Sequence, residues 1–112
     1  MSDLSNINIS MRLAAIKTLL RNHPRLIEKL VTPDGKRFNV EATPEALSLD
    51  DPWDLLACIA WDIWNGAGGA ELDRILNELS QDDFDAFTDA MKDFSDLRKK
   101  IRFAYVSGME DD

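Results

Sequence analysis

Residues 50–69 read DDPWDLLACIAWDIWNGAGG, and this stretch decides the fold. It contains all three tryptophans, the only cysteine and three of the five glycines of a 112-residue chain. Asp51 before Pro52 is typical of a helix N-cap followed by proline at the first helical position. Gly66 can adopt the left-handed conformation that commonly ends a helix. The pattern therefore predicts a helix over residues 52–65.

This predicted helix is apolar around most of its circumference. At about 100° per residue, the tryptophans and alanines fall on one side and the leucines and isoleucines on the adjoining side. Only Asp54, Cys58 and Asp62 remain for a narrow polar seam. A helix with so little polar surface is normally surrounded by other elements. We expect it to be the centre of the core, with Asp54 as a cap and Asp62 paired with an arginine such as Arg74.

The segments before it predict further helices. Apolar residues spaced by three and four positions predict a helix from about Ile9, and Pro24 is expected to break it after His23. Residues 25–31 fit either a second short helix or a strand. The turn Thr32-Pro33-Asp34-Gly35, followed by alternating polar and apolar residues, predicts an extended or hairpin segment near 31–42.

Three more helices complete the chain. Thr43-Pro44 predicts a single turn, and a short helix through Leu79 is expected to face inward with Leu72, Ile75, Leu76 and Leu79. Ser80–Asp83 resembles a capping box at the start of the last and longest helix, which is expected to end near Gly108. Its expected inner arc holds Phe84, Phe87, Met91, Phe94 and Ile101. The opposite arc is an aspartate stripe, which we define as Asp82, Asp85, Asp89, Asp93 and Asp96.

These patterns predict a mainly α fold. We expect a compact bundle of four to five helices around the Trp-rich helix 52–65, with a short extended or hairpin segment near 31–42. A length of 112 residues fits a single domain, 1–112, with loose polar ends at about 1–7 and 107–112. The longest apolar run is far shorter than the roughly 20 residues of a membrane span. With one cysteine and no signal-peptide pattern, a cytoplasmic location is expected.

The charge is strongly segregated along the chain. Residues 1–40 carry a net +4, residues 41–97 a net −13 and residues 98–112 a net +1, within an overall −8. Uniform acidity would mainly affect solubility. Segregated charge instead indicates that the charged regions have oppositely charged partners, within the molecule or outside it. The overall charge opposes DNA, and no RNA-binding motif accompanies the basic N-terminal third, so direct nucleic-acid binding is not expected.

The aspartate stripe is the sharpest functional signal in the sequence. Like charges four residues apart destabilise a helix by about 0.2–0.5 kcal/mol per pair, and aspartate is a poor helix former. One interpretation is a surface that docks on a basic protein and imitates the phosphate spacing of a nucleic acid. The other is a solvated face, or one neutralised internally by arginines of the N-terminal third.

The remaining patterns do not indicate a cofactor, a metal site or catalysis. The glycine-rich stretch 65–69 lacks the lysine and the preceding strand of a phosphate-binding loop and reads as a helix-to-helix connection. The sequence has a single histidine, His23, so few residues could form a catalytic set of nucleophile, general base and orienting residue. His23 is interpreted as a turn or cap residue. The Asp-rich run 82–89 lacks the glycine-bearing loop of a calcium site.

We therefore expect a non-enzymatic, acidic protein-binding module of inhibitor, immunity or mobile-element accessory type. The aspartate stripe is its expected contact with a basic protein partner. The alternative is a structural or regulatory homo-oligomer, such as a homodimer, whose interface is the Trp-rich helix through Trp53, Trp61 and Trp64.

Overall fold

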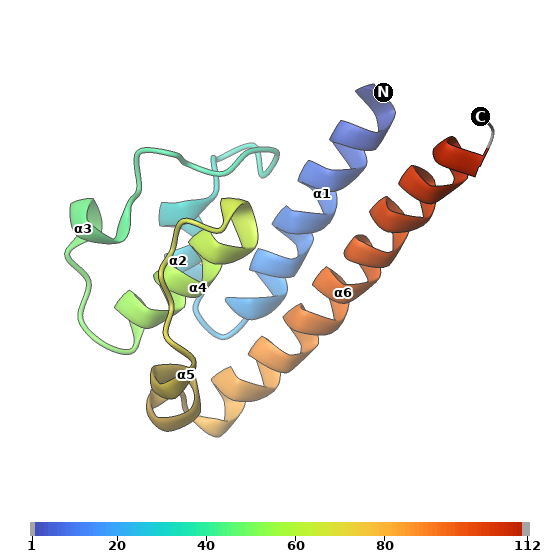
Figure 1. The fold of residues 1–112 in the computed structure, drawn as a ribbon. Coiled ribbons are helices and arrows are strands. Elements are labelled where there is room, and N and C mark those ends of the chain that lie inside the picture. Colours follow the sequence, from blue (N-terminus) through green and yellow to red (C-terminus); the bar gives the residue numbers. More distant parts are fainter. Residues whose placement is uncertain (1, 111–112) are drawn as a thin grey trace.

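In the computed structural model, the backbone is described for residues 2–110 and the side chains for residues 8–96. Within the described backbone the chain forms six helices and no strand. The helices are α1 (Ser2–Leu19), α2 (Pro24–Leu30), α3 (Pro44–Leu47), α4 (Trp53–Asn65), α5 (Leu72–Glu78) and α6 (Gln81–Glu110). The long helices α1 and α6 lie side by side and run in opposite directions, and the shorter helices gather on one flank of this pair (Figure 1). The predicted mainly α bundle is confirmed.

Helix α4 contributes more than half of its thirteen residues to the core, as expected of the central helix. It ends at Gly66, which has a φ of 79° and donates its backbone N–H to the carbonyl of Asp62. The predicted C-terminal glycine is therefore confirmed. Helix α4 shares the centre of the fold with α1, because α1 packs against both α4 and α6.

The start of α4 differs from the prediction. The helix begins at Trp53, Pro52 takes the N-cap position, and no side chain caps it. Instead, Asp51 accepts a hydrogen bond of 2.7 Å from Arg74, and Asp54 lies 3.7 Å from the same guanidinium. A charge-assisted bond to arginine is stronger than a neutral cap bond, so Arg74 draws both carboxylates away from the helix end. The predicted capping roles of Asp51 and Asp54 were wrong.

The segment before α3 resolves the question of helix or strand. Residues 24–30 are helical, and the expected hairpin reduces to one antiparallel bridge pair, Val31 with Phe38. The predicted turn is present, since Gly35 donates to the carbonyl of Thr32 and has a φ of 72°. A two-stranded pairing this short has marginal stability of its own and depends on the helices beneath it. Phe38 supplies that contact, because its ring packs against α4.

The ends of the long helices extend beyond the predicted limits. Helix α1 begins at Ser2 rather than near Ile9, and α6 continues through Gly108 to Glu110. The expected loose ends, about 1–7 and 107–112, therefore have a helical backbone over 2–7 and 107–110, while residues 1, 111 and 112 lie outside the described residues. The side chain of Ile101, expected on the inner arc of α6, also lies outside them.

The face that α6 turns toward α1 is not the predicted aromatic arc. Ala86 and Ala90 are fully buried, as is Ala15 on α1, and these small side chains allow the two helices to approach closely. The phenylalanines of the predicted arc, with Met91, lie to one side of this line and are only half-buried. The inner face of α6 is thus rotated by about a quarter turn from the prediction.

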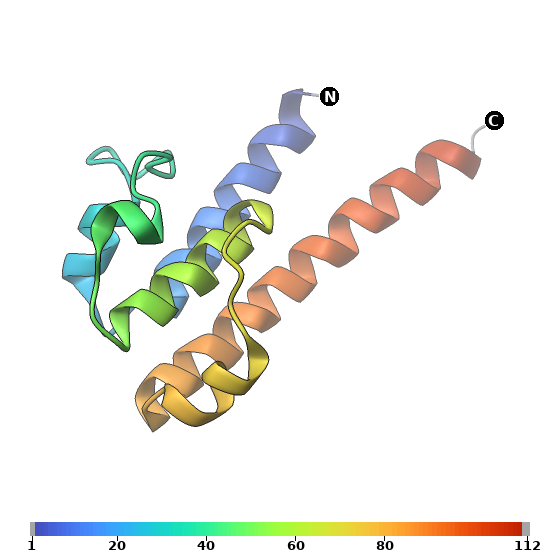
Figure 2. The ribbon, with the colours of Figure 1, turned by 60° about the vertical axis from the view of Figure 1, so that its left-hand side comes forward.

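Helix α5 also buries less than expected. Ile75 is buried and Leu79 half-buried, but Leu72 and Leu76 are 66% and 61% exposed. The predicted inner face was therefore wrong for two of its four leucine and isoleucine positions. Figure 2 shows α5 beside the first turns of α6, with the connection from α4 running down to it. Among the described residues, no helix has both the length and the apolar character needed to cross a membrane.

Candidate functional site

The residues of the aspartate stripe lie in one line along α6. At 1.5 Å per residue, the fourteen-residue interval from Asp82 to Asp96 spans about 21 Å. Asp82, Asp85 and Asp96 are exposed. Among the described side chains none of these three has a cation partner, and Asp85 accepts only a bond of 2.9 Å from Gln81, one turn earlier.

The middle of the stripe contacts α1. Arg21 donates a hydrogen bond of 2.7 Å to Asp89, although both side chains remain 44% exposed. Thr18 donates a bond of 3.1 Å to Asp93, which is half-buried. Internal neutralisation by the N-terminal third therefore holds at Asp89, where exposure limits the pair to about 0–1 kcal/mol. The stripe is divided into two inner positions tied to α1 and three outer positions that face solvent.

The three tryptophans are all engaged within the domain. Trp61 is buried and donates a hydrogen bond of 2.8 Å to the carbonyl of Ala42. Trp64 is half-buried and stacks on Phe38 with ring centroids 5.2 Å apart, while Trp61 meets the same ring edge-on. Trp53 is half-buried and donates to the ring of His23. These contacts place the indoles in the core, and an interface through Trp53, Trp61 and Trp64 stays a prediction.

A polar cluster that sequence reasoning missed joins α2, α4 and α6. His23 Nε2 lies 2.9 Å from both carboxylate oxygens of Asp83, whose side chain is almost fully buried. On the other side of the ring, Trp53 Nε1 donates to His23 Nδ1 at 3.2 Å. Because Nδ1 accepts from the indole, the neutral ring must carry its proton on Nε2 and donate it to Asp83.

This cluster also changes the predicted capping box. Ser80 accepts the backbone N–H of Asp83 at 3.2 Å, so the first half of the box is present. The reciprocal bond is missing because the Asp83 carboxylate binds His23 and Asn22 instead. With both ring nitrogens occupied, His23 has no open lone pair for general-base chemistry in this arrangement. It links three helices, which goes beyond the turn or cap role expected from the sequence.

Asp62 has a different role from the one predicted. Its Oδ1 accepts the backbone N–H groups of Gly68 and Gly69, at 2.8 and 3.1 Å, and its Oδ2 accepts that of Ala70 at 2.9 Å. The expected pairing with an arginine was wrong, because these three amides satisfy the carboxylate and Arg74 is occupied by Asp51, Asp54 and Glu78. Asp62 thus fixes the connection between α4 and α5.

An apolar groove lies between α4 and α6, and we call it the α4–α6 groove. It encloses about 230 Å³. Its lining residues are Ile59, Asp62 and Ile63 from α4, Ala70 from the connection, Ile75 from α5, and Phe87, Met91 and Phe94 from α6. The rotation of α6 creates this groove, since the helix packs on α1 through alanines and leaves its aromatic arc half-covered. The aspartate stripe lies on the opposite side of α6.

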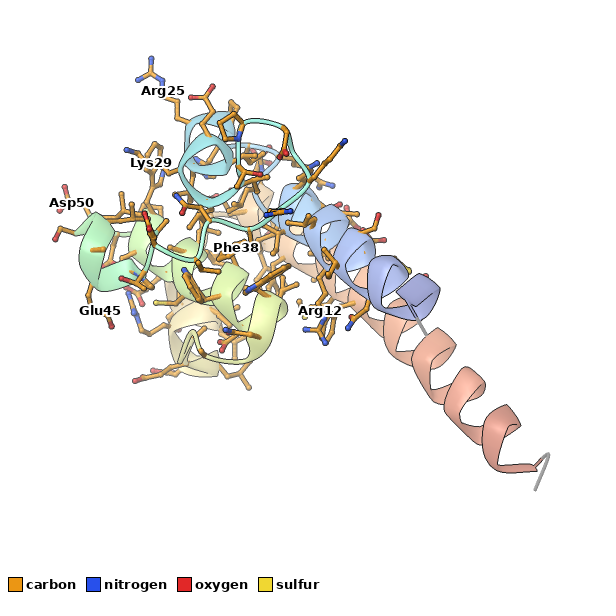
Figure 3. The ribbon with its side chains drawn as sticks, turned by 90° about the horizontal axis from the view of Figure 1, so that it is seen from above. Arg12, Arg25, Lys29, Phe38, Glu45 and Asp50 are labelled. Carbon is orange, nitrogen blue, oxygen red and sulfur yellow. The ribbon has the colours of Figure 1, made fainter. Side chains whose placement is uncertain are left out.

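Arg12 connects the helices at one end of this groove. Its guanidinium donates bonds of 2.7 and 3.1 Å to the carbonyls of Ile63 and Trp64, which are otherwise free at the C-terminus of α4. The same group lies over the Phe94 ring, 5.3 Å from its centroid. Figure 3 shows Arg12 between α1 and the end of α4. One side chain therefore binds α1 to both walls of the groove.

Apart from Arg12 and Arg21, several basic residues of the N-terminal third lie away from the aspartate stripe. Arg25 and Lys29 are exposed on α2 and point away from the body (Figure 3). Lys17 donates to the carbonyl of Gly35 at 3.2 Å and so supports the turn. These cations are not gathered against the aspartate stripe, so the segregation of charge in the sequence persists on the surface.

Cys58 lies on α4, close to the carboxylate of Asp54. Burial raises the pKa of the half-buried Cys58 thiol, and the nearby carboxylate of Asp54 raises it further. A raised pKa leaves less of the nucleophilic thiolate at a given pH. No three His, Cys, Asp or Glu side chains within residues 8–96 converge as metal ligands.

No family model matches the chain, and neither does any characterised protein or solved structure. The candidate site therefore rests on two surfaces of α6, the aspartate stripe and the α4–α6 groove. The sequence pattern found the first directly. The sequence signal available for the second was the pair Ala86 and Ala90, which lie one turn apart on the same face of the helix and are small enough for close packing.

Proposed function

We propose that this protein is a binding module that engages a basic protein through the outer positions of the aspartate stripe, Asp82, Asp85 and Asp96. The observation that carries the proposal is that these carboxylates face solvent along one line of α6 without a cation partner among the described side chains. Such a line produces a negative potential that attracts a basic surface and fixes its orientation. Clustered like charge also destabilises the helix, which favours a role in recognition.

The test is a capture experiment with matched charge removal. The triple variant Asp82→Asn, Asp85→Asn, Asp96→Asn removes three negative charges from the stripe. The control variant Glu41→Gln, Glu45→Gln, Asp50→Asn removes the same charge from exposed carboxylates of the α3 region, where Figure 3 shows Glu45 and Asp50. Both sets leave Asp89 and Asp93, which contact α1, unchanged.

The expected result is that a basic protein from the native host co-purifies with the wild-type chain and is released by salt. The stripe variant should lose this protein, while the control variant should retain it, because the effect depends on position and not on total charge. Equal retention by both variants contradicts the proposal. If the alternative homo-oligomer is correct, light scattering should show a stable assembly whose size does not change with salt concentration, because its interface is apolar.

A further inference from the structure

We propose that the α4–α6 groove is an anchor site for an amphipathic, basic helical segment of the partner protein. This inference rests on the proposed function, since it takes from there that the partner is basic, and it adds a second, apolar contact on the other side of α6. Acidic stripes give attraction and orientation, but most binding free energy comes from apolar anchors in desolvated pockets.

The first observation is an apolar surface that the fold leaves uncovered. Phe87, Met91 and Phe94 form one wall of the groove and are only half-buried, although large apolar side chains of this kind are normally covered. Beside the buried Ile75, the two leucines of α5 at positions 72 and 76 are among the most exposed apolar side chains of the described residues. Half-covered aromatic and aliphatic side chains along a groove are the kind of exposed apolar surface that marks a binding site.

The size and spacing of the groove fit helix anchors. Its volume of 230 Å³ exceeds the roughly 150 Å³ of a cavity that binds benzene, so it accommodates a large aliphatic or aromatic side chain. The wall residues of α6 follow the spacing i, i+4, i+7 over about 10 Å, two turns of a helix. A partner helix laid along this wall presents its own anchors at the same interval. Met91 adds an adaptable surface to the wall.

The charge around the groove selects a basic occupant. Asp62 lies in the groove wall, and its carboxylate has three amide partners but no cation among the described side chains. Glu71 is exposed and directly follows Ala70, the lining residue of the connection. Arg12 and Arg74 are already bound to carbonyls and carboxylates. A second copy of this chain, with its net −8, is disfavoured by the same charges.

The experiment uses a synthetic 18-residue helical peptide of leucine and lysine and a matched peptide in which glutamate replaces lysine. Titration of the full chain is followed by the methyl NMR signals of Ile59, Ile63 and Met91. The lysine peptide is expected to shift these signals saturably, and the glutamate peptide is not. The variant Leu76→Lys should weaken binding at least tenfold, because it places a cation on the exposed surface of α5 next to Ile75, which lines the groove.

Val40→Lys is the matched control, because Val40 is 63% exposed and lies in the segment before α3, away from the groove lining. It should bind the lysine peptide as the wild type does. Equal weakening by both variants, binding of both peptides, or no binding overturns the inference. If the chain forms a dimer that Leu76→Lys disrupts, a second copy is the occupant and the inference fails.

The two proposals fail in different ways. If the lysine peptide shifts only signals of the aspartate stripe and Leu76→Lys has no effect, the groove inference is overturned while the acidic contact stands. If the groove binds the lysine peptide but the stripe variant still captures the cellular partner, the stripe proposal fails and the groove remains an anchor site.

Discussion

Gly68 lies against the backbone of α4 more closely than a side chain allows. A Cβ at this position would lie 1.8 Å from the carbonyl oxygen of Cys58 and 2.8 Å from the amide nitrogen of Asp62. The Gly68→Ala variant must displace the connection and the three amides that bind Asp62. We expect it to lower the free energy of unfolding by about 3 kcal/mol, measured by urea denaturation.

Gly66→Ala is the matched control for this prediction. A Cβ at Gly66 meets no atom within 4 Å, but its φ of 79° strains any other residue. The expected cost is about 1–2 kcal/mol, which comes from the left-handed backbone alone. Equal losses for the two variants contradict the steric account of Gly68.

The hydrogen bond from Trp53 fixes the tautomer of His23, which leads to a second residue-scale prediction. Long-range ¹H–¹⁵N NMR of the neutral ring should show the proton on Nε2. The reason is that Nδ1 accepts from the indole while Nε2 donates to Asp83. A ring protonated on Nδ1 would contradict the cluster. Trp53→Phe removes the indole donor and should shift the Nδ1 resonance.

At the scale of elements, Arg12 is the contact that joins α1 to the end of α4. Replacing it by methionine keeps an unbranched apolar stem but leaves the carbonyls of Ile63 and Trp64 without their donor. We expect Arg12→Met to lower the free energy of unfolding by about 2 kcal/mol, the cost of losing charge-assisted hydrogen bonds. Thermal or urea unfolding measures this loss.

Arg25→Met provides the comparison, because Arg25 is exposed on α2 and points outward (Figure 3). A surface substitution of this kind changes stability by no more than about 0.5 kcal/mol. If the two arginine variants lose the same stability, the bonds to the end of α4 contribute little.

The elements themselves were largely predictable from local signals, and their faces were not. Periodicity, proline and glycine located α3, α4 and the turn before Phe38 because these signals act within a few residues, but they left the α2 region open between helix and strand. The face that α6 buries depends on what lies opposite. The aromatic arc was predicted to face inward because it is hydrophobic. Ala86 and Ala90 instead permit a closer approach to α1 and so determine which face of α6 is buried.

The candidate site was likewise predictable where its residues are close in sequence and not where they are far apart. The aspartate stripe was visible in the sequence because its residues share one helix at regular spacing. Its division into inner and outer positions was not, since Asp89 meets Arg21 across 68 residues of chain. The same holds for His23 and Asp83, which are 60 residues apart. Residues that are brought together only by tertiary packing show no regular spacing in the sequence, so a sequence pattern does not reveal them.

At the scale of the whole molecule, segregated charge has a consequence for stability. The chain carries a net −8, and its described arginine ion pairs, Arg21 with Asp89 and Arg74 with its carboxylates, are partly open to solvent. Exposed pairs contribute little, whereas repulsion within the acidic body acts on the whole folded state. The urea midpoint is therefore expected to rise between about 20 and 200 mM NaCl, because salt screens repulsion over distances near 10 Å.

The double variant Asp85→Asn, Asp96→Asn isolates the contribution of the stripe. Both residues lack a cation partner among the described side chains, so their removal relieves repulsion without breaking any of the described ion pairs. At low salt we expect this variant to be more stable than the wild type by about 0.5–1 kcal/mol, with a smaller response to salt. A midpoint that falls as salt rises would show that the ion pairs outweigh the repulsion. If the double variant is also no more stable than the wild type at low salt, the outer aspartates impose no cost on the helix, and that argument for a role in recognition fails.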